Sequence, residues 1–134
     1  MILVDSSVWI DYFKDVRSPE TTRLDALLGA EEIVSGDLIV AEVLQGVSSE
    51  REFNLVRQTM TSAMRVVTLA GEDVAIQAAR NYRYLRAQGV TIRKTIDPII
   101  ATYCIENQVP LLFSDRDFKP FVEHLDLQSA LHDA

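Results

Sequence analysis

Two short apolar runs, one near each end of the chain, lead directly into an aspartate. Residues 1–4 precede Asp5, and the segment 110–114 precedes Asp115. Unbroken apolar runs of this kind are typical of strands buried on both faces of a parallel sheet. A carboxylate at the end of such a strand is costly unless it is solvated, hydrogen-bonded or paired with a cation. The pattern therefore predicts two acids at one sheet edge, where open α/β sheets bind ligands.

Helical segments separate the predicted strands. We expect strands at residues 1–5, 32–35, 66–69 and 110–114, and near 125–127. We expect helices at residues 7–13, 20–28, 38–45, 49–63, 72–88 and 97–107. Strands that alternate with helices are joined by right-handed crossovers, which place helices on both faces of the sheet. We predict an α/β fold, a three-layer α/β/α sandwich with a mostly parallel central sheet.

Three polar residues are expected to begin helices. Ser7 and Asp37 each precede an apolar helical pattern and are suitable N-caps. Asp97 stands directly before Pro98, and the residue before a proline is disfavoured in the α region, so Asp97 is also predicted as an N-cap.

Composition limits the class of protein. The 134 residues fit a single domain spanning 1–134, and 48% hydrophobic and 25% charged residues are ordinary for a globular protein. Strand-like sequence follows Met1 at once, which leaves no room for a signal peptide, and no apolar run is long enough to span a membrane. Cys104 is the only cysteine and is expected in the core, so no internal disulfide forms and a cytoplasmic location is expected.

The net charge of the chain argues against a protein that binds nucleic acid non-specifically along its length. The formal net charge is −7, whereas such proteins are usually basic. A local basic rim remains compatible with this charge, because five of the 13 Lys and Arg residues lie between positions 80 and 94.

Four acids are candidates for one site: Asp5, Glu42, Asp97 and Asp115. Each alone has an ordinary explanation as a cap, a turn residue or a solvated charge. The helical pattern places Glu42 opposite an apolar stripe that we expect to face the core, formed by Val40, Val43, Leu44 and Val47. Carboxylates that share a pocket repel unless a cation binds, and oxygen ligands favour Mg²⁺ first, with Mn²⁺ as the alternative. The two histidines, in the C-terminal tail without a cysteine nearby, do not suggest zinc.

The segments that carry these acids resemble PIN-domain ribonucleases, and more closely the VapC toxins of toxin–antitoxin modules. The resemblance rests on residues 2–9 around Asp5, on Glu42 in its short helix, on residues 97–101, and on residues 114–118. It covers essentially the whole chain. Pro98 departs from the family pattern, which has small or acidic residues there, and Asp117 is an additional acid that not every relative uses.

The resemblance implies a metal-dependent endoribonuclease that leaves 5′-phosphate and 3′-hydroxyl ends. Asp5, Asp97 and Asp115 would hold one or two Mg²⁺ ions, and Glu42 would act as an outer ligand or orient the attacking water. Ser6 and Ser114 are candidates to orient the carboxylates. The implied partners are RNA, a small VapB-type antitoxin that blocks the acidic pocket with an Arg or Lys, and a second copy of the chain.

Candidate phosphate contacts lie close to the acids in sequence. Arg93, Lys94 and Arg116 are the predicted substrate-binding residues. Arg80, Arg83 and Arg86 follow one side of a long helix, where a solvated face with ion pairs explains them at least as well as RNA contact does.

Two alternatives to the nuclease stay open at this point. A phosphatase using Asp5 as nucleophile typically has a second acid two positions on, where this chain has Ser7. A non-catalytic α/β metal-binding or regulatory module would use the same acids without hydrolysis.

Overall fold

The central sheet has four parallel strands. The computed structural model describes residues 1–30 and 32–132. The strands are β1 (Ile2–Val4), β2 (Ile33–Gly36), β3 (Val66–Val67) and β4 (Leu111–Leu112), in the order β3-β2-β1-β4. Leu3 of β1 is in register with Val34 of β2 and with Leu111 of β4. The predicted parallel sheet is confirmed, with strands shorter than the apolar runs that indicated them.

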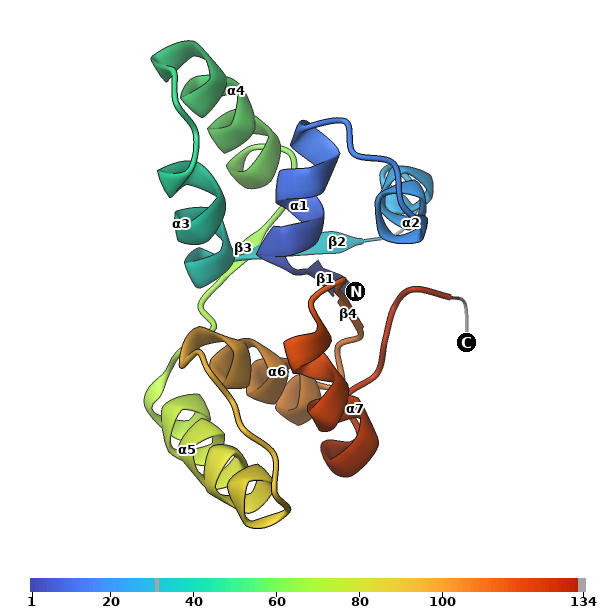
Figure 1. Ribbon diagram of the computed structural model, residues 1–134. Helices are drawn as coiled ribbons and strands as arrows, with labels where there is room; N and C mark the ends of the chain where they lie inside the picture. Colours follow the sequence, from blue (N-terminus) through green and yellow to red (C-terminus); the bar gives the residue numbers. More distant parts are fainter. Residues whose placement is uncertain (31, 133–134) are drawn as a thin grey trace.

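Seven helices surround the sheet. They are α1 (Ser6–Phe13), α2 (Pro19–Leu27), α3 (Asp37–Gln45), α4 (Glu50–Thr61), α5 (Glu72–Ala87), α6 (Ile96–Asn107) and α7 (Lys119–Leu125) in the described part of the chain. Figure 1 shows α1 to α4 on one side of the sheet and α5 to α7 on the other, which confirms the three layers. None of these described helices has both the length and the apolar character needed to cross a membrane.

Both faces of β1 are covered, which explains its unbroken apolar sequence. Leu3 and Val4 have no exposed surface, and neither do Trp9 of α1 and Ile100 of α6. Cys104 of α6 is 1% exposed and belongs to this core, as predicted. A strand packed between helix layers has no polar face to present, so the alternation of a half-exposed strand is missing.

The start of α1 differs from the prediction. Ser7 lies inside the helix, and Asp5 is the N-cap, with its carboxylate Oδ2 accepting a hydrogen bond from the backbone N of Ser7 at 3.3 Å. The strand therefore passes into the helix with one residue between them. This tight passage holds the Asp5 side chain at the edge of the sheet.

Two other helix starts are shifted by one or two residues. Gly36 takes the N-cap position of α3, and Thr95 takes that of α6. Asp37 lies in the first turn of α3, where its Oδ1 accepts from the backbone N of Leu38 at 2.9 Å and of Leu69 at 3.0 Å. Asp97 likewise lies in the first turn of α6. Neither acid caps its helix, so the predicted cap roles are wrong.

The predicted strand near residues 125–127 is also wrong. Residues 119–125 form α7, with Pro120 in its first turn, and Phe121 is fully buried. Phe118, Phe121 and Leu125 follow the three- and four-residue spacing of a buried helix face, which is the signal that indicates α7. Beyond the helix, Ser129 forms an isolated parallel bridge with Leu111 of β4.

The strand order creates a crevice beside β1. The chain adds β2 and β3 on one side of β1 and then returns to add β4 on the other side. Open α/β sheets bind ligands where the order reverses in this way, outside the carboxyl ends of the strands. Asp5 follows β1 and Asp115 lies shortly after β4, so both acids stand at this reversal.

Candidate metal centre

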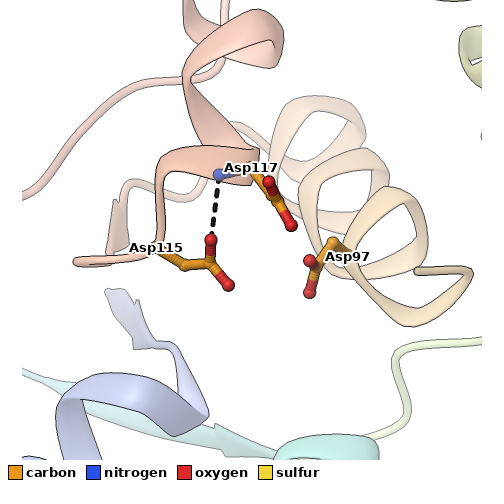
Figure 2. Close-up of side chains that lie close together, drawn as sticks. All are labelled: Asp97, Asp115 and Asp117. Atoms are coloured by element: carbon orange, nitrogen blue, oxygen red, sulfur yellow. Dashed lines mark hydrogen bonds between the residues drawn. The ribbon is translucent and has the colours of Figure 1, made fainter. Parts of the chain in front are cut away.

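Three aspartates meet at the crevice. Asp97, Asp115 and Asp117 each offer a carboxylate oxygen, and these oxygens lie within 4.8 Å of one another. Figure 2 shows Asp97 extending from α6 and the other two extending from the turn after β4, toward a common space. Two segments with no sequence proximity thus supply one acidic cluster.

The turn after β4 fixes Asp115 through its own backbone. Oδ1 of Asp115 accepts from the backbone N of Asp117 at 2.9 Å, which caps the short 3-10 helix Arg116–Phe118. Phe118 is fully buried and anchors this turn. Oδ2 of Asp115 takes no part in this cap and is paired with the Lys94 Nζ at 3.6 Å.

Asp97 is the least satisfied member of the cluster. Its residue is 5% exposed, and its Oδ2 has no hydrogen-bond partner among the described residues. Burial, and then the negative charges of Asp5 and Asp115, raise the pKa of Asp97 to about 7. A buried carboxylate oxygen without a donor, in an all-oxygen cluster, fits a hard divalent cation such as Mg²⁺ or Mn²⁺.

Asp5 lies on the other side of the crevice and is also buried, at 3% exposed. Its Oδ2 accepts from the Ser7 hydroxyl at 2.6 Å, and its backbone N donates to the Leu112 carbonyl at 2.9 Å. Burial raises the pKa of Asp5, although the Ser7 hydrogen bonds act in the opposite direction. Its carboxylate charge raises the pKa of Asp97, which places both acids in one electrostatic site.

Glu42 faces the core edge, contrary to the predicted orientation. The fully buried residue of α3 is Ile39, which lies outside the predicted core stripe, and Val43 of that stripe is 3% exposed. Glu42 lies one turn after Ile39 and is half-buried. Its Oε1 accepts from the Ser6 hydroxyl at 3.1 Å, and its charge contributes to the raised pKa of Asp5. Glu42 therefore reaches the same sheet edge as Asp5.

Serine hydroxyls support the acids on the N-terminal side. Ser6 orients Glu42, whereas the Ser114 hydroxyl donates to the Ser7 hydroxyl at 3.2 Å and to no acid among the described residues. Ser7, which the sequence indicated as a cap, donates its hydroxyl hydrogen to Asp5. The Asp-Ser-Ser order supplied a signal for this, because an aspartate commonly accepts hydrogen bonds from the residue two positions later.

A basic rim borders the cluster. Lys94 lies 3.6 Å from Asp115, and the charges of Asp97 and then Asp115 raise its pKa. Arg93 and Arg116 are also exposed. Arg93 directly precedes Lys94 on the segment before α6, and Arg116 lies in the turn between Asp115 and Asp117. Arg80, Arg83 and Arg86 are exposed on α5, which packs against α6 (Figure 1).

The parallel sheet and its edge of carboxylates define an α/β protein with a candidate divalent-metal centre. The PIN domain family model matches residues 2–122, and the chain belongs to this family. Among curated proteins, it is 29% identical to ribonuclease VapC11 of Mycobacterium tuberculosis and to VapC ribonuclease Mb1587 of Mycobacterium bovis. Each alignment covers 97% of this chain and 98% of the relative.

Solved structures confirm the fold. The chain in the Rickettsia felis VapBC2 complex bound to a promoter DNA fragment matches with a TM-score of 0.72 and 16% identity, over 96% of this chain and 97% of that one. A chain of VapBC-1 from nontypeable Haemophilus influenzae matches with a TM-score of 0.70 and 21% identity, over 96% of both chains. The predicted family and fold class are confirmed.

Proposed function

We propose that this protein is the toxin of a toxin–antitoxin module and acts as a metal-dependent endoribonuclease. The observation that carries the proposal is the aspartate cluster with the unpartnered Oδ2 of Asp97, set at the strand reversal of a PIN domain. The full-length relatives at 29% identity are named as VapC ribonucleases, which supports RNA as the substrate. Such an activity is expected in the cytoplasm.

Asp97 and Asp115 would hold a Mg²⁺ ion, with Asp5 completing the site across the crevice and Asp117 beside it. Mn²⁺ is the alternative ion. When bound, the metal would lower the pKa of water and offset the charge that builds up on the phosphate. The carboxylates are held for this role by the cap of α1, the first turn of α6 and the turn after β4.

The other residues of the site position the substrate and the attacking water. Glu42, held by the Ser6 hydroxyl, would orient a water molecule and accept its proton. Arg93, Lys94 and Arg116 provide positive charge for the phosphates of the RNA. Because water is the nucleophile rather than the ribose 2′-hydroxyl, the products carry 5′-phosphate and 3′-hydroxyl ends.

The nuclease is tested by incubating the purified protein with RNA in Mg²⁺ and in chelator. Cleavage is expected only with Mg²⁺, and labelling of the new ends identifies the 5′-phosphate. Asp5→Asn should abolish cleavage while circular dichroism shows an intact fold. RNA that survives equally in both buffers, after removal of any antitoxin, would refute the proposal.

A cavity between α1, α3 and α4 supports an antitoxin partner. Its volume is about 490 Å³, and its lining includes Ile10, Phe13, Val43, Val47 and Leu55. We propose that an apolar antitoxin segment docks here and that an Arg or Lys of the antitoxin enters the acidic pocket. The helical hairpin of residues 38–63, which contains α3 and α4, is also the proposed face for a homodimer. A copurifying small protein that leaves cleavage unchanged would contradict the antitoxin assignment.

The phosphatase alternative is less well supported. A nucleophilic Asp5 needs an accessible carboxylate oxygen, yet the residue is 3% exposed and its Oδ2 is bound by the Ser7 hydroxyl.

A further inference from the structure

A second cavity lies between α5, α6 and the segment that joins them, and its lining includes Lys94, which is paired with Asp115 of the acidic cluster. Its volume is about 480 Å³. Resting on the ribonuclease function proposed above, we propose that this cavity is a nucleobase subsite, which receives one base of the RNA next to the cleaved phosphate. It is called the α5–α6 cavity below.

The wall of the α5–α6 cavity suits a flat, largely apolar ring. Ala75, Ala78 and Ala79 of α5 contribute methyl groups, so α5 leaves space where larger side chains would fill it. Ile92 and Ile99 line the opposite side. Tyr82, half-buried, adds an aromatic ring to the lining. Aromatic rings in such positions stack on bases of any sequence, because every base has a π-face.

The rim of the cavity is basic in a protein that is acidic overall. Arg83, Arg93 and Lys94 line it, and no Asp or Glu is among the described residues of the lining. The chain carries a net charge of −7, so three cations around one apolar hollow are a local reversal of charge. An apolar base attached to anionic phosphates matches this combination, since the base fills the hollow and the phosphates meet the rim.

Two residues connect the cavity to the acidic cluster. Lys94 lines the cavity, and its Nζ is also 3.6 Å from Oδ2 of Asp115. Pro98 lines the cavity directly after Asp97 in the first turn of α6. A nucleotide with its phosphate at the carboxylates therefore has its base beside the opening of the cavity.

The cavity between α1, α3 and α4 differs in the features that matter for RNA. It has a similar volume of about 490 Å³, but its lining holds one cation, Lys14, with one acid, Glu52, and none of its lining residues is next in sequence to an aspartate of the acidic cluster. Charge and position together favour the α5–α6 cavity for the base.

The test fills the cavity from a position that does not disturb the fold. Ala79 is exposed on α5 and lines the cavity, so Ala79→Leu adds bulk to the hollow while keeping a strong helix former. Ala87→Leu, also exposed but at the end of α5 and outside the lining, is the matched control. The probe is a random-sequence pool of single-stranded RNA oligonucleotides, cleaved in Mg²⁺, with the new 5′ ends sequenced.

The wild-type protein should show a base preference at one position beside the cut. Ala79→Leu should flatten that preference and lower kcat/KM roughly tenfold, the size of effect expected when one base–aromatic stack is lost. Tyr82→Ala should act in the same direction, Tyr82→Phe should keep the preference, and Ala87→Leu should match the wild type.

The outcomes separate this inference from the function on which it rests. If the wild type does not cleave the pool, the proposed function and the subsite both fail. If the wild type cleaves and Ala79→Leu keeps both its rate and its base preference, only the subsite is refuted. If Ala79→Leu leaves cleavage intact but changes the oligomeric state or antitoxin binding, the cavity is a protein interface and the inference is wrong.

Discussion

The acids of the candidate metal centre come from two parts of the chain, which differ in how their carboxylates are hydrogen-bonded. On the N-terminal side, Asp5 accepts from the Ser7 hydroxyl and Glu42 from the Ser6 hydroxyl. On the C-terminal side, Asp97 is as buried as Asp5, yet its Oδ2 has no partner among the described residues. The N-terminal acids are thus held by hydrogen bonds from the protein itself, whereas the charged form of Asp97 depends on a nearby cation, either Lys94 or a bound metal ion.

The largest expected effect follows from removing the unsatisfied charge. Asp97→Asn should lower RNA cleavage by about 100-fold or more, because it removes a proposed metal ligand. It should also make the metal-free protein more stable, on the order of 1–2 kcal/mol at pH 8, because a buried charge is lost. Cleavage assays and thermal unfolding in chelator measure the two effects.

The matched control for this substitution is on the same helix. Glu106 is exposed near the end of α6, so Glu106→Gln should change neither cleavage nor unfolding beyond experimental error. A metal-free Asp97→Asn protein that is less stable than the wild type would show that the Asp97 carboxylate is satisfied in some other way.

The second effect is a pH dependence of stability in the absence of metal. The pKa of Asp97 is raised from 3.8 to about 7, so the folded protein keeps a proton that the unfolded chain releases between these values. Asp97 therefore contributes stability below pH 3.8 that is lost as pH rises to about 7.

The measurement compares the wild type with Asp97→Asn by denaturant unfolding in chelator across this pH range. The difference between the two curves should change in the predicted direction, and saturating Mg²⁺ should offset the loss at pH 8. Parallel curves for the two proteins would contradict the raised pKa.

The parts of the site that the sequence predicts are those where local sequence alone sets the position. Asp5 and Asp115 follow apolar runs, so their position at one edge of the sheet can be predicted without knowing how distant segments pack. The orientation of α3 required such knowledge. Val40, Leu44 and Val47 are half-buried, while Ile39 is fully buried, so α3 is apolar on more than one face. The sequence could not tell which of these faces meets the sheet, so the helical pattern predicts Glu42 directly opposite the core, whereas the structure has it half-buried at the sheet edge.

The third prediction concerns Asp5, whose carboxylate is hydrogen-bonded by the protein. Ser7→Ala removes the 2.6 Å hydrogen bond to Asp5 and should lower the free energy of unfolding by about 1–2 kcal/mol. Cleavage should fall by less than in Asp97→Asn, because the carboxylate itself remains. Ser114→Ala, which loses only the 3.2 Å contact with the Ser7 hydroxyl, is the graded control and should cost less. Equal losses for both variants would mean that Ser7 supports Asp5 no more than any exposed serine does.

The smallest expected effect concerns the ammonium group of Lys94, which is the positive charge nearest to Asp115 in the ion pair described above. Lys94 lies 3.6 Å from Asp115, but its side chain is 58% exposed, so the pair adds little to stability. The ammonium group nevertheless competes with a metal ion for the same carboxylate. Lys94→Ala should therefore tighten Mg²⁺ binding to the RNA-free protein by about two- to fivefold, as measured by calorimetry. The same variant should weaken RNA cleavage, because the proposed contact between Lys94 and the phosphate is lost. Tighter Mg²⁺ binding together with weaker cleavage would identify Lys94 as a phosphate contact. Weaker Mg²⁺ binding in Lys94→Ala would instead show that Lys94 holds Asp115 in position for the metal.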